Sequence, residues 1–186
     1  MKKFAIIATI GLMLLGFAGK ASAQLLPDVP DMKGKIIYGG NFGGGIYGNN
    51  LDISIAPQVG YRIFSPWEVG VRGIYSLSCY FNSMSGNEYG HYFGVAPYTN
   101  VQVYKGLFLH AEDELMYGLS RWNHQTIVSQ WFNSTFVGAG YRQYTSIRSF
   151  VYCMVLYNLT WGNGFSIGGL NTPYSTPISI RVGFCF

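Results

Sequence analysis

The stretch Leu51-Asp52-Ile53-Ser54-Ile55-Ala56-Pro57-Gln58-Val59-Gly60-Tyr61-Arg62 alternates bulky apolar residues with small or polar ones at a period of two. A β-strand sends successive side chains to opposite faces, so this segment is predicted to be a strand with one apolar face. The same alternation recurs in 68–81, 92–103 and 107–117. The protein is therefore expected to be built from amphipathic strands.

The composition decides which side of these strands faces outward. The 186 residues are 49% hydrophobic and only 11% charged, whereas about 25% charged residues is usual in soluble domains. The polar faces carry Gly, Ser, Asn and Gln, and the apolar faces are bulky and rich in aromatic residues. A barrel in lipid turns its apolar face outward and its small polar face inward. A transmembrane barrel is favoured, and a secreted soluble β-barrel or sandwich is the alternative.

Eight strands are expected from the alternation and the turn residues between them. Their predicted ranges are 33–43, 50–62, 67–80, 91–104, 107–118, 130–142, 148–159 and 177–186. Short connections alternate with long ones at 81–90, 119–129 and 160–176, as in outer-membrane barrels with short periplasmic turns and long extracellular loops. The predicted fold is all-β, an eight-stranded antiparallel up-and-down transmembrane β-barrel with both termini at the short-turn end.

The first 23 residues are predicted to be a signal peptide. Lys2 and Lys3 precede an apolar run, and Ala21-Ser22-Ala23 supplies a small-residue cleavage pattern. Cleavage would leave 24–186 as the barrel domain and remove Lys2, Lys3 and Lys20, which lowers the formal net charge from +4 to +1. That charge argues against nucleic-acid binding. Export and an inside-out barrel together predict the outer membrane of a Gram-negative cell.

The carboxyl-terminal strand alternates Ile178, Ile180, Val182, Phe184 and Phe186 with smaller or polar residues. It resembles the terminal strand by which outer-membrane barrels are recognised for assembly, which implies the barrel-assembly machinery as a partner and gives Phe184 and Phe186 the role of assembly signal. An ordinary amphipathic last strand is the alternative.

The whole mature region resembles small eight-stranded outer-membrane barrels of the OmpA/OmpX type. The stretches 54–62 (SIAPQVGYR), 107–112 (LFLHAE) and 137–143 (VGAGYRQ) resemble a family of uncharacterised outer-membrane β-barrel-domain proteins. The resemblance implies a fold, a location and outer-membrane lipids as surroundings. It implies neither an activity nor catalytic residues.

The inward faces of the predicted strands carry ionisable residues. These are Arg72, His110, Glu112, Glu114, Arg142 and Arg181. Side chains fill the interior of an eight-stranded barrel, so these charges are expected to pair in a buried network rather than line a channel. A proton or ion path, or a narrow pore, is the alternative. His110 and Glu112 could serve as acid–base partners in a lipid A-modifying enzyme, but they point inward near a short turn, and no enzyme activity is expected.

Aromatic residues are expected in two belts at opposite ends of the strands, as in interfacial girdles. Trp122, His124, Trp131 and Trp161 are also candidates for contacting an extracellular ligand from the long loops. Asp113 does not fit the pattern, because its parity places it on the lipid face. The cost of a carboxylate facing lipid could be reduced by a bulge, by a position near the headgroups or by a contact between protomers.

Three other patterns carry no chemistry. The six residues 43–48 match G-x-G-x-x-G, but a strand rather than a helix follows, so a glycine-rich hairpin loop is predicted. Two N-glycosylation patterns at Asn133 and Asn158 fall on predicted strands and are treated as chance. The three cysteines match no zinc or redox spacing, so free thiols, no metal and no cofactor are expected. The predicted role is that of a monomeric envelope protein, either structural or binding through its loops.

Overall fold

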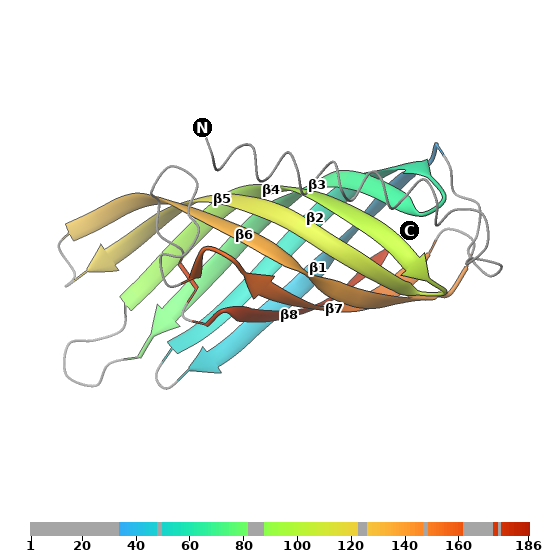
Figure 1. The fold of residues 1–186 in the computed structure, drawn as a ribbon. Helices are drawn as coiled ribbons and strands as arrows, with labels where there is room; N and C mark the ends of the chain where they lie inside the picture. The colour runs from blue at the N-terminus through green and yellow to red at the C-terminus, as the bar shows by residue number, and fades with distance from the viewer. Residues whose placement is uncertain are drawn as a thin grey trace.

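The fold is a closed antiparallel barrel in which each strand pairs with the next along the chain and β8 returns to β1 (Figure 1). The computed structural model describes residues 34–47, 50–81, 88–122, 126–146, 149–161, 173–174 and 176–186. The strands are β1 (Ile36–Tyr47), β2 (Asn50–Phe64), β3 (Trp67–Tyr80), β4 (Glu88–Tyr104), β5 (Leu107–Trp122), β6 (Thr126–Tyr144), β7 (Phe150–Asn158) and β8 (Ile178–Cys185). The predicted fold class is confirmed. The expected signal peptide lies outside the described residues.

The barrel is apolar on its outside. Along β7, Tyr152, Met154 and Leu156 are buried, while Val151 and Val155 are about half exposed. Bulky apolar side chains are exposed on all eight strands. A soluble protein would bury such residues, so this pattern is the inversion typical of a barrel in lipid. In the part of the chain that the structure describes, no helix is long and apolar enough to cross a bilayer.

The expected loop 81–90 is shortened by β4, which begins at Glu88, and two further predicted loops are wrong in extent. Residues 119–129 were expected to form a loop, yet β5 continues to Trp122 and β6 begins at Thr126. The glycine-rich 43–48 was also expected to form a loop, yet β1 continues to Tyr47 and pairs with β2 as far as Asn50. The physical reason is the same in both cases, because a hairpin ladder is held by backbone hydrogen bonds that do not require an apolar face.

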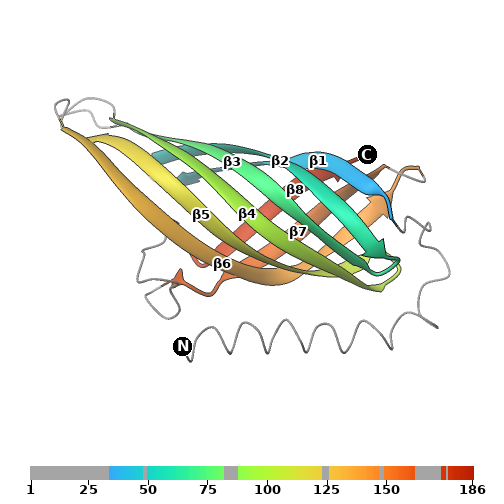
Figure 2. The same cartoon turned by 90° about the horizontal axis from the view of Figure 1, so that it is seen from above.

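The strands run obliquely around the barrel axis, and the short connections gather at one end (Figure 2). At that end the β2–β3 and β4–β5 hairpins each contain a register shift, between Arg62 and Phe64 and between Gln102 and Tyr104. Lys105 in the β4–β5 turn has a φ of 32°, in the left-handed region. These irregularities decide which inward side chains face one another across the strands.

The lumen contains two apolar clusters. One lies mainly on β5 to β8 and includes Phe108, Phe136 and Leu156. The other joins Ala56, Ile74, Ala96 and Met116 on β2 to β5. Gly140 makes room for the first, because a Cβ there would lie 2.5 Å from the Phe108 ring. The polar lumen residues occupy the remaining space. The three cysteines, Cys79, Cys153 and Cys185, are free thiols as expected.

Candidate functional site in the barrel lumen

The structure places the six predicted ionisable residues inside the barrel, each at most 8% exposed. It adds Arg62 and Glu68, which are equally buried. These charges form two groups, one centred on Glu68 near the short-turn end and one on Glu112 and Glu114 further along the lumen. The lumen is therefore occupied by ion pairs.

Glu68 is the acceptor at the centre of the first group. Its Oε2 accepts hydrogen bonds from Arg142 Nη1 at 3.1 Å and from Arg62 Nη2 at 3.5 Å. Its Oε1 accepts hydrogen bonds from the Tyr98 hydroxyl at 3.2 Å and from Asn100 Nδ2 at 3.1 Å. A buried carboxylate is tolerated when a counter-charge faces it and its lone pairs are satisfied. Both conditions hold for Glu68, and its two arginine partners leave this group with one excess positive charge.

Aromatic rings complete the surroundings of Arg142. Its guanidinium carbon lies 4.5 Å from the Phe108 ring centroid and 4.7 Å from that of Phe150. Both distances fall within the range of cation–π attraction, which strengthens when the cation is withdrawn from water. Arg142 is thus held by one carboxylate and two ring faces.

The second group is held by Arg181, which forks between two carboxylates. Its Nη1 lies 2.5 Å from Glu112 Oε1 and its Nη2 lies 2.9 Å from Glu114 Oε1. Arg72 also contacts Glu112, and its Nη2 lies 3.6 Å from Glu114. The Arg181 guanidinium carbon is 4.9 Å from the centroid of Phe136. Two arginines therefore balance two glutamates.

A hydrogen-bonded bridge joins the two groups. Asn100 donates to Glu68 through Nδ2, so its Oδ1 faces His110 Nδ1, which lies 2.6 Å away. The other ring nitrogen of His110 lies 3.0 Å from Glu112 Oε2. Asn100 Oδ1 and the Glu112 carboxylate can both only accept, so a hydrogen bond at each ring nitrogen requires that His110 carry a proton on both. The polar groups form one continuous column from Glu68 to Glu114.

Tyr174, from the connection between β7 and β8, closes the column at its far end. Its hydroxyl lies 2.6 Å from Glu114 Oε2, and its ring meets the Phe136 ring edge-on at 5.1 Å. Burial, followed by the nearby charge of Glu114, raises the pKa of the Tyr174 hydroxyl. The phenol is therefore protonated at neutral pH and donates to the carboxylate.

Little free space remains beside this column. A cavity of about 10 Å³ is lined by Glu68, Asn100, His110 and Arg142 among others, which is roughly the room that one water needs. Arg142 Nε has no hydrogen-bond partner among the described residues, and Arg72 Nε and Nη1 have none either. This cavity is therefore too small for a hydrated ion.

Several members of this site were missed at the level of sequence. Arg62 and Glu68 share the inward parity of Arg72, and that signal was sufficient to find them. Asn100 and His110 become partners only through the register of β4 and β5. Within the described residues, no three His, Cys, Asp or Glu side chains are grouped in a way that could hold a metal ion.

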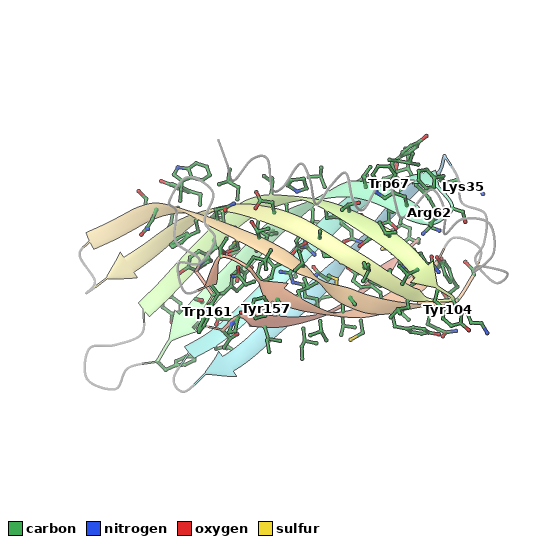
Figure 3. All side chains as sticks on the ribbon, in the orientation of Figure 1. Lys35, Arg62, Trp67, Tyr104, Tyr157 and Trp161 are labelled. Atoms are coloured by element: carbon green, nitrogen blue, oxygen red, sulfur yellow. The ribbon has the colours of Figure 1, made fainter. Side chains whose placement is uncertain are left out.

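The predicted loop-ligand residues are scattered. Trp131 lies within β6 rather than in a loop, is 51% exposed and packs against Tyr117 at 5.0 Å between ring centroids. Trp161 follows β7 and is exposed. Trp122 is the last residue of β5, and His124 lies outside the described residues. In Figure 3, Trp67 and Tyr104 lie near the short-turn end, and Tyr157 and Trp161 lie farther along the barrel, in keeping with two aromatic belts.

Asp113 lies on the outer face and is half-buried. Its carboxylate accepts Thr135 Oγ1 at 2.7 Å and Asn133 Nδ2 at 3.2 Å. The two asparagines of the N-glycosylation patterns are both buried. Asn133 is only 3% exposed although its parity points outward, and Asn158 faces the lumen and is fully buried. Local hydrogen bonds from β6 therefore satisfy the carboxylate that the sequence left unexplained.

Replacing Asp113 with valine should lower the free energy of unfolding by about 1–3 kcal/mol, because the hydroxyl of Thr135 loses its acceptor. Asp113→Val combined with Thr135→Val should cost less than Asp113→Val alone, since both partners then become apolar on a lipid-facing surface. Urea titration of the refolded protein in detergent micelles measures both variants. Additive losses in the double variant would contradict this account.

Comparisons with known proteins bear on the fold. No family model matches the sequence, and no curated protein matches it. Among solved structures, the chain is similar to a de novo designed transmembrane β-barrel, with a TM-score of 0.43 and 13% identity over 83% of this chain and 95% of that one. It is similar to the N-terminal β-barrel domain of Pseudomonas aeruginosa OprF, with a TM-score of 0.44 and 14% identity over 83% and 97% of the two chains. The likeness is one of fold alone.

Proposed function

We propose that the protein is an integral outer-membrane β-barrel with a filled lumen, which serves the cell envelope as a structural or surface-interaction protein and has no enzymatic activity. The observation that carries the proposal is the combination of an apolar outer wall with a lumen closed by ion pairs. An apolar outer wall fits a bilayer. A plugged lumen fits a protein that acts through its ends or its outer surface rather than by conduction.

The proposal includes partners that follow from the same arrangement. Outer-membrane lipids would contact the apolar wall, and the barrel-assembly machinery would recognise β8 through Phe184 and the terminal Phe186, whose rings are stacked at 6.2 Å between centroids. An extracellular ligand would meet the long-loop end, where Trp131 and Trp161 are exposed. Eight strands close one barrel within a single chain, so we propose a monomer.

Planar-bilayer recording tests the filled lumen. The purified protein should insert and give no stable conductance, because arginine–glutamate pairs and aromatic rings occupy the lumen. Insertion is verified in parallel by a folded band on gels that shifts only after boiling. Reproducible single-channel steps from protein that has passed this check would overturn the filled-lumen proposal and favour a narrow pore.

The rival function, lipid A modification, has its own test. His110 faces Asn100 and Glu112 inside the barrel, so it is turned away from the lipid surface. Lipid A mass spectra from cells with and without the gene should be identical. A changed acyl pattern that is restored by the wild-type gene would replace the proposal with an enzymatic one.

A further inference from the structure

The small cavity in the lumen lies beside the Glu68 group, which consists of Arg62, Glu68 and Arg142. This group is near the short-turn end of the barrel, where Arg62 is labelled in Figure 3. The cavity has a volume of about 10 Å³, and its wall includes Glu68, Arg142, the side-chain amides of Gln58 and Asn100, and aromatic rings. Each residue of the wall is at most 8% exposed. An occupant of the cavity would therefore be shielded from bulk water.

The charges around this cavity do not balance. Arg62 and Arg142 share the single carboxylate of Glu68, which leaves one excess positive charge. The second group of the column does not compensate for it, because its two arginines already balance its two glutamates. Asp52, the inward carboxylate of β2, lies six residues from Gln58, roughly 20 Å along the strand. The excess charge is therefore buried without a counter-charge among the described residues, which is costly.

The wall of the cavity has hydrogen-bond donors to spare. Asn100 uses one hydrogen of its amide for Glu68, and Gln58 uses one for the sulfur of Cys185. Each amide carries a second hydrogen, which has no acceptor among the described residues. Arg142 Nε has no partner there either. Glu68, the only carboxylate of the wall, already accepts four hydrogen bonds. The wall therefore offers several hydrogens to an occupant that can accept them.

Size and charge together select the occupant. The volume is about the room that one water needs, which excludes sulfate, phosphate and organic acids. The excess positive charge disfavours a cation. A water molecule would fit the space, but it would leave the excess charge uncompensated. A monatomic anion without its hydration shell is only slightly larger than water, accepts hydrogen bonds from every side and supplies the missing charge.

We propose that the cavity beside Glu68 and Arg142 binds one chloride ion without its hydration shell. The ion accepts hydrogen bonds from Asn100 and Gln58 and compensates the excess positive charge of the Glu68 group. The site goes beyond the envelope role proposed above. It does not require that the lumen conducts ions, because the bound chloride is one more member of the packed column.

Urea unfolding at graded chloride concentrations tests the site in the whole protein. The protein is held in micelles of an uncharged detergent, and sodium gluconate, whose anion is too large for the cavity, keeps the ionic strength constant. A ligand that binds only the folded state lowers the unfolding equilibrium constant by the factor 1 + [Cl⁻]/Kd. Once chloride exceeds Kd, a tenfold rise should thus lower this constant about tenfold. Equal stability in chloride and gluconate would mean that water fills the cavity, and the chloride site would be refuted.

Arg62→Met removes the excess charge and leaves the cavity wall intact. Arg62 is paired with Glu68 but is not part of the wall, and Glu68 keeps Arg142 as its partner. The chloride dependence should disappear in this variant. Lys105→Met changes the net charge equally but removes an exposed cation in the β4–β5 turn, so it should retain the dependence. Dependence that persists in Arg62→Met, or that is lost equally in Lys105→Met, would indicate general screening of charge and contradict the proposal.

Diffraction gives a reading that needs no variant. Long-wavelength data from crystals of the wild-type protein grown in sodium chloride should show an anomalous peak in the cavity, within hydrogen-bond distance of Asn100 Nδ2 and Gln58 Nε2. The peak should be absent from crystals grown in sodium gluconate. A cavity without a peak in chloride, or with the same peak in gluconate, would exclude bound chloride.

Discussion

Glu68→Gln should lower the free energy of unfolding by about 3–5 kcal/mol, the loss typical when one member of a buried ion pair is removed. The substitution keeps the shape of the side chain and removes its charge. Arg62 and Arg142 then lie buried without a counter-charge. All four hydrogen bonds to this side chain lose their charged acceptor, and the two that meet the new amide nitrogen lose their acceptor altogether. Urea titration in detergent micelles, followed by the folded gel band, measures the effect.

Asp52→Asn is the matched control for Glu68→Gln. It also converts an inward carboxylate to an amide and changes the net charge equally, but Asp52 is partly exposed and forms no ion pair among the described side chains. Its effect should remain within about 0.5 kcal/mol. A loss as large as that of Glu68→Gln would show that charge removal alone, rather than the broken pairing, destabilises the barrel.

A double variant tests whether the loss in Glu68→Gln comes from the arginine that is left without a partner. Arg142→Met added to Glu68→Gln removes one stranded cation and leaves an apolar chain between Phe108 and Phe150. The double variant should lose clearly less stability than the sum of the two single losses, because the charges are coupled. Strict additivity would contradict the central role assigned to the Glu68–Arg142 pair.

The inward placement of the ionisable residues could be predicted because a strand repeats every two residues. Arg72, Glu112 and Arg181 fall on the polar parity of their strands, and a barrel with an apolar outside leaves that parity only the lumen. Arg62 and Glu68 obey the same rule and could have been included. Parity specifies the face of each residue but not its partners.

The partners depend on register, and register was beyond the sequence. The turn at Lys105–Gly106 places Tyr104 opposite Leu107, and a regular ladder from that pair would set Asn100 opposite Ala111. The irregularity between Gln102 and Tyr104 shifts the register by one residue and sets Asn100 opposite His110. A bulge reverses which side chains meet. The alternation on the two strands excludes the Asn100–Ala111 pairing, because opposed side chains share a face, but it does not identify His110 as the partner of Asn100.

The positions of Tyr174 and of the β1–β8 pairing were unpredictable for a different reason. Tyr174 lies in a connection, and only packing against Phe136 and Glu114 places it in the lumen. The β1–β8 pairing joins the first and last strands, whose alignment follows from all the intervening registers. Asp113 is a different case. The sequence correctly indicated a carboxylate on the outer face, and the hydrogen bond that satisfies it was visible only once the structure placed Thr135 opposite Asp113.

Arg181→Met should also lower the free energy of unfolding by about 3–5 kcal/mol. Arg181 is the only described residue of β8 that forms ion pairs, and through Glu112 and Glu114 it ties the last strand to β5 across the lumen. Without it, two buried carboxylates share Arg72 alone as a cationic partner of fixed charge. Methionine fills similar volume, so lost packing contributes little to the change. Urea titration with Lys105→Met as the control for an exposed cation measures it.

Arg181→Lys distinguishes charge from geometry. Lysine restores the positive charge, but its single ammonium cannot place two nitrogens in the planar fork that now spans Glu112 and Glu114, nor stack a flat cation on Phe136. We expect a loss intermediate between wild type and Arg181→Met. Full recovery by lysine would mean that a point charge suffices, whereas no recovery would mean that the forked contact alone joins β8 to the lumen column.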